Sequence, residues 1–140
     1  MSKVYLAISG APDKLLGHVD ESGKVSRSQI GLDKQIGYVN LATGEIYESH
    51  FGPDKTVGRV ETSSGKVYAT RWGPDKYVGW VRADGHIYRH KALAPDEYIG
   101  QVDPALSFAH AAAAMVLLVL PALEVDASSD APDDPDETNQ

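Results

Sequence analysis

The chain contains no cysteine among its 140 residues. Disulfide scaffolds, thiolate metal sites and cysteine nucleophiles are therefore excluded as explanations of its fold or function. No cluster of basic residues with interleaved aromatics is present, so we expect no nucleic-acid partner. The N-terminal segment MSKVYLAIS has no apolar run of signal-peptide length, which makes a cytoplasmic protein the expectation.

The sequence also lacks the residue patterns typical of an active site. No serine stands in a recognisable nucleophile context with a histidine and an acid, and no pair of carboxylates lies in an apolar setting. On a strand, His86 and His90 would share a face about 13 Å apart, too far to share a metal ion. We therefore expect a protein that is not an enzyme and has neither a cofactor nor a metal site.

Acidic residues are balanced by basic ones through most of the chain but not at the C-terminus. The formal net charge is -7, yet thirteen Lys or Arg residues balance thirteen Asp or Glu residues up to Asp103. The remaining seven acidic residues lie in 124–140, together with serines and prolines and without aromatics. Such a composition buries too little apolar surface to order itself, so 124–140 is predicted to be a disordered acidic tail.

The first hundred residues repeat one unit of about twenty-one residues, and length predicts a single domain over 1–123. Each unit reads as two short strands with a Gly-containing turn between them. Because Lys3–Tyr5 matches Lys66–Tyr68, the chain opens on a second strand and ends on a first strand, Glu97 to Val102. Five units thus predict a mainly β ring or barrel of about ten antiparallel strands, closed or nearly closed, in which the first strand pairs with the last.

Two columns of the repeat are predicted to have structural roles. The strand glycines follow an apolar residue and precede a valine by two positions, which favours a β-bulge at each: Gly17, Gly37, Gly58, Gly79 and Gly100. The aspartates stand in Gly-Pro-Asp-Lys turns or variants of them, and each is expected to bond its own downstream amides: Asp13, Asp33, Asp54, Asp75 and Asp96. As the alternative, a ring of five aspartates could bind a cation.

An uncharged apolar segment, 105–120, follows the repeats and is predicted to form a helix, with Pro104 in its first turn and Pro121 at its end. Ten strands enclose more space than their own side chains fill, so the helix could lie in the centre of the ring. The alternative is a membrane anchor over 105–123, which nearly reaches the length of a span. Its many alanines and the absence of flanking Lys or Arg favour the central helix.

With its Gly-Pro-Asp-Lys turns, its five Gly-x-Val strands and its terminal apolar segment, the chain resembles the β-flower repeat proteins, in a five-fold version, over residues 3 to about 123. The resemblance implies a shallow ring of β-hairpin petals, similar to tubby-type domains in which a barrel surrounds an apolar helix and some members bind phosphoinositides. It implies no catalytic residues. The chain departs from its own repeat at Ser26, Leu32 and Glu97.

The remaining candidate sites consist of lysines, aromatic residues and two histidines. Four lysines follow the aligned aspartates and could bind an anionic ligand such as a lipid headgroup, although nearby acids favour a solvated surface: Lys14, Lys34, Lys55 and Lys76. Trp72, Trp80 and Phe51 could form an aromatic rim, or half-buried sheet surface. His18 falls in a variable column and is expected to be exposed, while His110 is expected to be buried and hydrogen-bonded, with a pH switch as the alternative.

Two functions follow. The first is a non-enzymatic scaffold or binding module, expected to be a monomer, for a lipid headgroup or a protein. The second is a tail-anchored protein that presents the β-ring at a membrane surface. The sequence favours the first, because the apolar segment fits the centre of the ring better than a bilayer.

Overall fold

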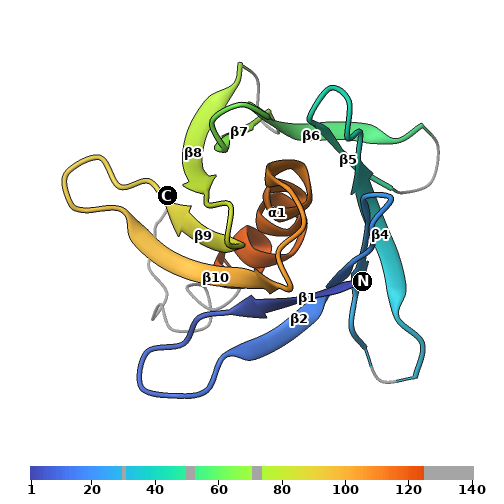
Figure 1. Ribbon diagram of the computed structural model, residues 1–140, viewed down its shortest axis with the longest axis horizontal. Coiled ribbons are helices and arrows are strands. Elements are labelled where there is room, and N and C mark those ends of the chain that lie inside the picture. Colours follow the sequence, from blue (N-terminus) through green and yellow to red (C-terminus); the bar gives the residue numbers. More distant parts are fainter. Residues whose placement is uncertain (30, 50–52, 71–73, 125–140) are drawn as a thin grey trace, which may run out of the picture.

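The chain folds into a closed barrel of ten antiparallel strands around a C-terminal helix (Figure 1). The computed structural model describes residues 1–29, 31–49, 53–70 and 74–124. Phe51, Trp72 and the predicted disordered tail beyond Glu124 lie outside the described residues. The strands are β1 (Ser2–Leu6), β2 (Lys14–Val19), β3 (Lys24–Arg27), β4 (Lys34–Val39), β5 (Glu45–Glu48), β6 (Lys55–Val60), β7 (Lys66–Ala69), β8 (Lys76–Val81), β9 (His86–Arg89) and β10 (Glu97–Asp103).

The barrel closes between its first and last strands. β1 pairs antiparallel with β10 from Lys3 opposite Asp103 to Leu6 opposite Gly100. On its other side β1 pairs with β2. The fifth repeat is therefore made of β10 and β1, two strands from opposite ends of the chain. The predicted pairing of the first and last strands is confirmed, and it leaves the sheet without a free edge.

A β-bulge interrupts the pairing between successive repeats. Between β7 and β8, Val67 lies opposite Gly79 but Tyr68 lies opposite Tyr77, so Val78 has no partner of its own. The same shift occurs just before the aligned glycine in the four other pairings between repeats. The bulge turns both the residue before the glycine and the valine after it toward the barrel interior, as the sequence pattern predicts.

The two ends of the barrel differ in the turns that they carry. Strands β3, β5, β7 and β9 all end at the same rim at which β2, β4, β6 and β8 begin, because neighbouring strands are antiparallel. We call this end the lysine rim, because the four strands that begin there, β2, β4, β6 and β8, each start with a lysine: Lys14, Lys34, Lys55 and Lys76. Turns 7–13 and 90–96 at the lysine rim project outward from the barrel (Figure 1). The hairpin turns lie at the opposite end, the hairpin rim.

The helix begins and ends later than the sequence predicts. The Ser107 side chain caps it, α1 covers Phe108–Ala114, a π-helical segment covers Met115–Val119, and helix continues to 124. Pro104 therefore lies before the helix, and Pro121 lies within it. The predicted bounds of 105–120 are wrong at both ends, and Glu124 belongs to the helix rather than to the predicted tail.

The π-helical segment explains how Pro121 is tolerated. A proline inside an α-helix has no N–H to donate and its ring collides with the carbonyl four residues earlier. Here the turn before Pro121 is widened, and the Leu120 N–H donates to the Met115 carbonyl, five residues earlier. Such widened turns occur as short insertions in α-helices and relieve this kind of conflict.

The helix fills the centre of the barrel, as expected (Figure 1). Its residues from Ala109 to Val119 are all buried. It runs from the hairpin rim, where His110 bonds the Glu21 carbonyl, to the lysine rim, where Pro121 and Ala122 lie beside Lys14. In the described part of the chain, no helix combines the length and apolar character that a membrane span requires.

Five consecutive helix residues each face a different aligned glycine. A Cβ placed on Gly79 would lie 2.8 Å from Met115 Cε, and one on Gly58 would lie 3.4 Å from Val116 Cγ2. The series continues around the ring in order. Its other pairs are Gly37 with Leu117, Gly17 with Leu118 and Gly100 with Val119.

Candidate functional site

The aligned aspartates join neighbouring repeats on the outer wall of the barrel. The residue that follows each aligned glycine contacts the aspartate of the next repeat, and the fifth contact closes the ring. Trp80 Nε1 donates to Asp96 at 2.8 Å, His18 Nδ1 lies 3.2 Å from Asp33, and Arg59 pairs with Asp75. The other two contacts are Tyr38 with Asp54 and Gln101 with Asp13, the latter at 3.4 Å.

These contacts change the predicted roles of the aspartates and of His18. Among the described residues, only Asp96 of the five accepts from a backbone amide, and that amide, Lys91 N, lies upstream. The expectation that each aspartate bonds its own downstream amides is therefore wrong. His18, with its side chain only 19% exposed, is half-buried against Asp33 rather than fully exposed.

The outer-wall contacts shift the pKa values of their partners. The hydrogen bond from Trp80 stabilises the charged form of Asp96 and lowers its pKa, with further help from the Lys91 amide and His90. Desolvation, followed by the hydrogen bond to Asp54, raises the pKa of Tyr38. The hydrogen bond to Asp75 raises the pKa of Arg59. The aspartates thus act as anionic links between repeats, and the described residues bring no three potential metal ligands together.

Among the described residues, aromatic side chains on the wall pair across strands. Trp80 stacks on Tyr88 with ring centroids 4.2 Å apart, Tyr38 stacks on Tyr47, and Arg59 lies over the ring of Tyr68. Their faces are occupied by one another, which is typical of half-buried sheet surface.

His110 is buried and hydrogen-bonded through both ring nitrogens, as expected. Its Nδ1 lies 2.7 Å from Ser107 Oγ and its Nε2 lies 2.9 Å from the Glu21 carbonyl oxygen. A carbonyl can only accept, so Nε2 carries the proton, and a neutral ring then accepts at Nδ1 from the serine hydroxyl. His110 therefore ties the start of the helix to a hairpin turn.

Grooves lie at the lysine rim, between the strand ends and the C-terminal end of the helix. They share a common construction. The walls come from strand-end residues with long basic side chains, and the floor comes from bulge residues such as Leu16, Ile36 and Val78 with helix residues Leu117, Leu118 and Leu120. Each of these grooves joins charged and apolar groups.

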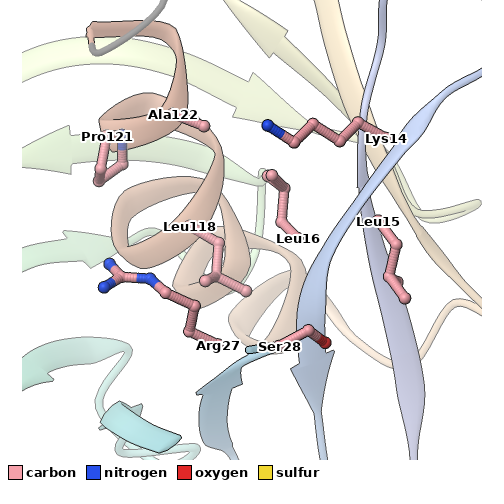
Figure 2. A pocket seen from close by; sticks show the side chains of 8 residues that line it. All are labelled: Lys14, Leu15, Leu16, Arg27, Ser28, Leu118, Pro121 and Ala122. Carbon is pink, nitrogen blue, oxygen red and sulfur yellow. The ribbon is translucent and has the colours of Figure 1, made fainter. Parts of the chain in front are cut away.

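The groove between β2, β3 and the helix has a volume of about 350 Å³ (Figure 2). We call it the Lys14 groove. Figure 2 shows Lys14 and Arg27 reaching toward the helix end from two strands, with Leu16 and Leu118 between them. The described lining residues include two cations and no carboxylate: Lys14, Leu15, Leu16, Arg27, Ser28, Leu118, Pro121 and Ala122. A second groove of about 180 Å³ adjoins it and shares Arg27 and Pro121.

The cations of these two grooves lack partners within the described residues. The side chains of Lys14, Arg27 and Lys34 make no ion pair or hydrogen bond with any described residue. Some cations elsewhere are paired, since Arg59 pairs with Asp75 and Arg89 pairs with Glu97 at 2.6 Å. Single lysines without an ion pair to a described residue also occur at other places on the barrel: Lys3, Lys24, Lys66 and Lys76. The side of the lysine rim with Lys14, Arg27 and Lys34 differs from these places because it gathers three unpaired cations in two adjoining grooves.

Arg27 and Lys34 lie directly opposite each other across β3 and β4. Like charges in this position destabilise a sheet. The equivalent positions in two other repeats hold opposite charges, Glu48 opposite Lys55 and Arg89 opposite Glu97. The third equivalent pair is Ala69 opposite Lys76. Only the β3–β4 pair, among these four, places two cations together.

The four predicted lysines have different surroundings. Lys14 lines the groove that has no carboxylate, and Lys34 lines the adjoining groove, which holds Arg27 and also Glu48. Lys76 lines a groove that holds Arg89 and Glu124, and Lys55 begins β6 opposite Glu48. Sequence reasoning missed Arg27. Aligning the last residue of each second strand would have revealed it, because that column varies in charge from repeat to repeat: Leu6, Arg27, Glu48, Ala69 and Arg89.

Comparisons of the chain with protein-family models, with curated proteins and with solved structures found no match. Its function is therefore inferred from its own geometry.

Proposed function

We propose that this protein is a non-enzymatic binding module that takes an anionic lipid headgroup in the Lys14 groove. The observation that carries the proposal is the cluster of Lys14, Arg27 and Lys34, three cations without described partners, two of which are cross-strand neighbours. A phosphate placed among them would offset their mutual repulsion and accept several charge-assisted hydrogen bonds. Arg27 supplies a planar fork of donors suited to phosphate, and Ser28 adds a hydroxyl.

The floor of the groove favours a lipid over a free anion. Leu16 and Leu118 lie between the two cations, so a ligand that carries apolar carbon beside its phosphate fits better than inorganic phosphate (Figure 2). Ligand sites commonly combine an apolar lining with a few polar groups in this way. We infer a monomeric cytoplasmic protein that associates reversibly with anionic membranes, without a cofactor.

The resemblance to β-flower repeat proteins supports this proposal in part. The closed barrel of ten antiparallel strands and its central helix are compatible with the β-repeat architecture that the resemblance implies. The proposal adds a specific ligand site in one sector of the ring, built by the β2–β4 side alone.

The test is sedimentation with phosphatidylcholine vesicles that contain or lack phosphatidylserine. Binding is expected only to the anionic vesicles and should weaken as salt is raised. The variant Lys14→Gln/Arg27→Gln/Lys34→Gln should lose most of it. The matched control removes three exposed lysines at the hairpin rim, Lys3→Gln/Lys24→Gln/Lys66→Gln, and should bind as the wild type does. Equal loss in both triple variants would reduce the interaction to net charge and overturn the site.

The membrane-anchor alternative makes an opposite prediction. An anchored helix would have to leave the barrel and expose the surface that now covers Met115 and its neighbours, which are fully buried. An anchored protein would remain with membranes in high salt, whereas a protein held by the Lys14 groove would be released. Salt extraction of membranes therefore separates the two functions.

A further inference from the structure

Large apolar side chains are exposed in the turns between repeats. Leu93 is 100% exposed, Leu32 is 85% exposed and Ile8 is 38% exposed. They occupy three separate turns, between β9 and β10, β3 and β4, and β1 and β2 respectively. None of the three takes part in the core cluster.

All three turns lie at the lysine rim, because the turns between repeats join the ends of odd-numbered strands to the starts of even-numbered ones. Leu32 lies two residues before Lys34, and Ile8 lies in the turn that leads to Lys14. The turns that hold Ile8 and Leu93 project outward beyond the barrel wall (Figure 1). The two most exposed leucines therefore share one end of the molecule with the unpaired cations Lys14, Arg27 and Lys34. The hairpin rim also holds exposed apolar residues, but they are less exposed: Met1 at 65%, Leu41 at 41% and Leu106 at 36%.

We propose that Leu32, Leu93 and Ile8 insert into an anionic bilayer, at the boundary between headgroups and acyl chains, when the lysine rim lies on a membrane. This inference rests on the proposed function and extends it from one headgroup to a membrane surface. Apolar side chains at such a boundary bind in proportion to the area they bury, and neighbouring cations add attraction to anionic lipids. A flat bilayer can contact three separate turns at one end of a barrel at once.

The chemistry of the rim favours a lipid surface over a protein partner. The apolar residues stand singly on separate turns and form no contiguous patch of the kind that marks a protein interface. The cations that stand between them fit the negative surface of a membrane. A second copy of the chain would bring the unpaired cations of both copies together.

The absence of cysteine permits a site-specific test in the full chain. Leu32→Cys and Leu93→Cys, each labelled with an environment-sensitive fluorophore, report insertion at the lysine rim. Ala42→Cys and Ala83→Cys are exposed positions in hairpin turns and serve as matched controls at the opposite rim. With phosphatidylserine-containing vesicles, the first two labels should shift to shorter wavelength and be quenched by lipids that carry a spin label in the acyl chain. The controls should do neither.

A second measurement separates insertion from headgroup binding. Leu32→Ser/Leu93→Ser should lower vesicle affinity by about ten-fold for each leucine, taking about 1.4 kcal/mol as one factor of ten. The same variant should bind a soluble polyanion, inositol hexakisphosphate, as the wild type does. If the polyanion binds but neither label shifts, insertion is wrong and the proposed function stands. If neither the polyanion nor vesicles bind, both fail. A shift without vesicles that grows with protein concentration would indicate self-association and overturn insertion.

Discussion

Gly58 offers a direct test of why the repeat requires glycine in its first strand. A Cβ at Gly58 would lie 2.7 Å from the Tyr68 carbonyl oxygen on β7, closer than side chains normally approach a backbone atom. Its next neighbour, Val116 Cγ2, would lie 3.4 Å away, which is ordinary van der Waals contact. The collision is therefore with the neighbouring strand and not with the helix.

Gly58→Ala should destabilise the protein by about 2 to 4 kcal/mol, because β6 must move away from β7 and the pairing of these two strands weakens. For a domain of this size each kcal/mol corresponds to a fall in Tm of about 4 °C, so a decrease of about 8 to 16 °C is expected. Thermal unfolding followed by circular dichroism, together with urea titration, measures both quantities.

The control is Gly31→Ala, where an added Cβ meets no atom within 4 Å but φ is +94°. It should cost only about 1 kcal/mol, from backbone strain without collision. If Gly58→Ala costs no more than this control, the collision argument is refuted.

Double variants sharpen the same reasoning. Val116→Ala should not relieve Gly58→Ala, so the two costs should add to within about 0.5 kcal/mol. At Gly37 the added Cβ would lie 2.8 Å from Leu117 Cδ1, so Leu117→Ala should relieve part of the cost of Gly37→Ala. Full relief at Gly58 by Val116→Ala would show that the helix, and not β7, demands the glycine there.

Three further predictions concern the helix and the outer wall. His110→Phe should lower stability by about 1 to 3 kcal/mol, because it leaves the Glu21 carbonyl unsatisfied; denaturant unfolding measures the loss and His110→Gln should recover part of it. The pKa values of Asp96 and Glu97 are lowered in the folded state, so their contribution to folding stability is complete above the unfolded pKa and is lost as pH falls through the folded pKa values. Tm measured between about pH 7 and pH 3 should therefore fall at the acid end. The fall should be less steep in Asp96→Asn. Truncation after Asp103 should abolish cooperative unfolding, since it removes the helix that fills the barrel; a truncated chain with an unchanged Tm would contradict this.

The repeated part of the fold could be predicted because its signal is reinforced five times. Five aligned glycines, each after an apolar residue and two before a valine, indicate a bulge more strongly than any one of them alone. The match of Lys3–Tyr5 to Lys66–Tyr68 predicted which strands would meet at the seam. These properties are local or periodic, so they can be recognised from the sequence alone.

The features that sequence missed depend on contacts between repeats. The bond from Trp80 to Asp96 joins residues sixteen positions apart, and its geometry follows from the stagger of neighbouring strands, which the repeat period does not specify. Arg27 and Lys34 became a pair only once the register of β3 and β4 was known. Pro121 was expected to end the helix by a local rule, but burial in the barrel outweighs that rule.

The π-helical segment connects the fold to the candidate site. An α-helix turns about 100° per residue, whereas five hairpins spaced evenly around a ring require about 72° from one to the next. Widening the turn lowers the rotation per residue, so the five residues from Met115 to Val119 can each face a successive glycine. Leu118 of this series and Pro121 just beyond it also form the floor of the Lys14 groove. The groove consequently exists only while the helix occupies the barrel, so a variant that expels the helix, such as Gly79→Leu, should lose anionic-vesicle binding together with its fold.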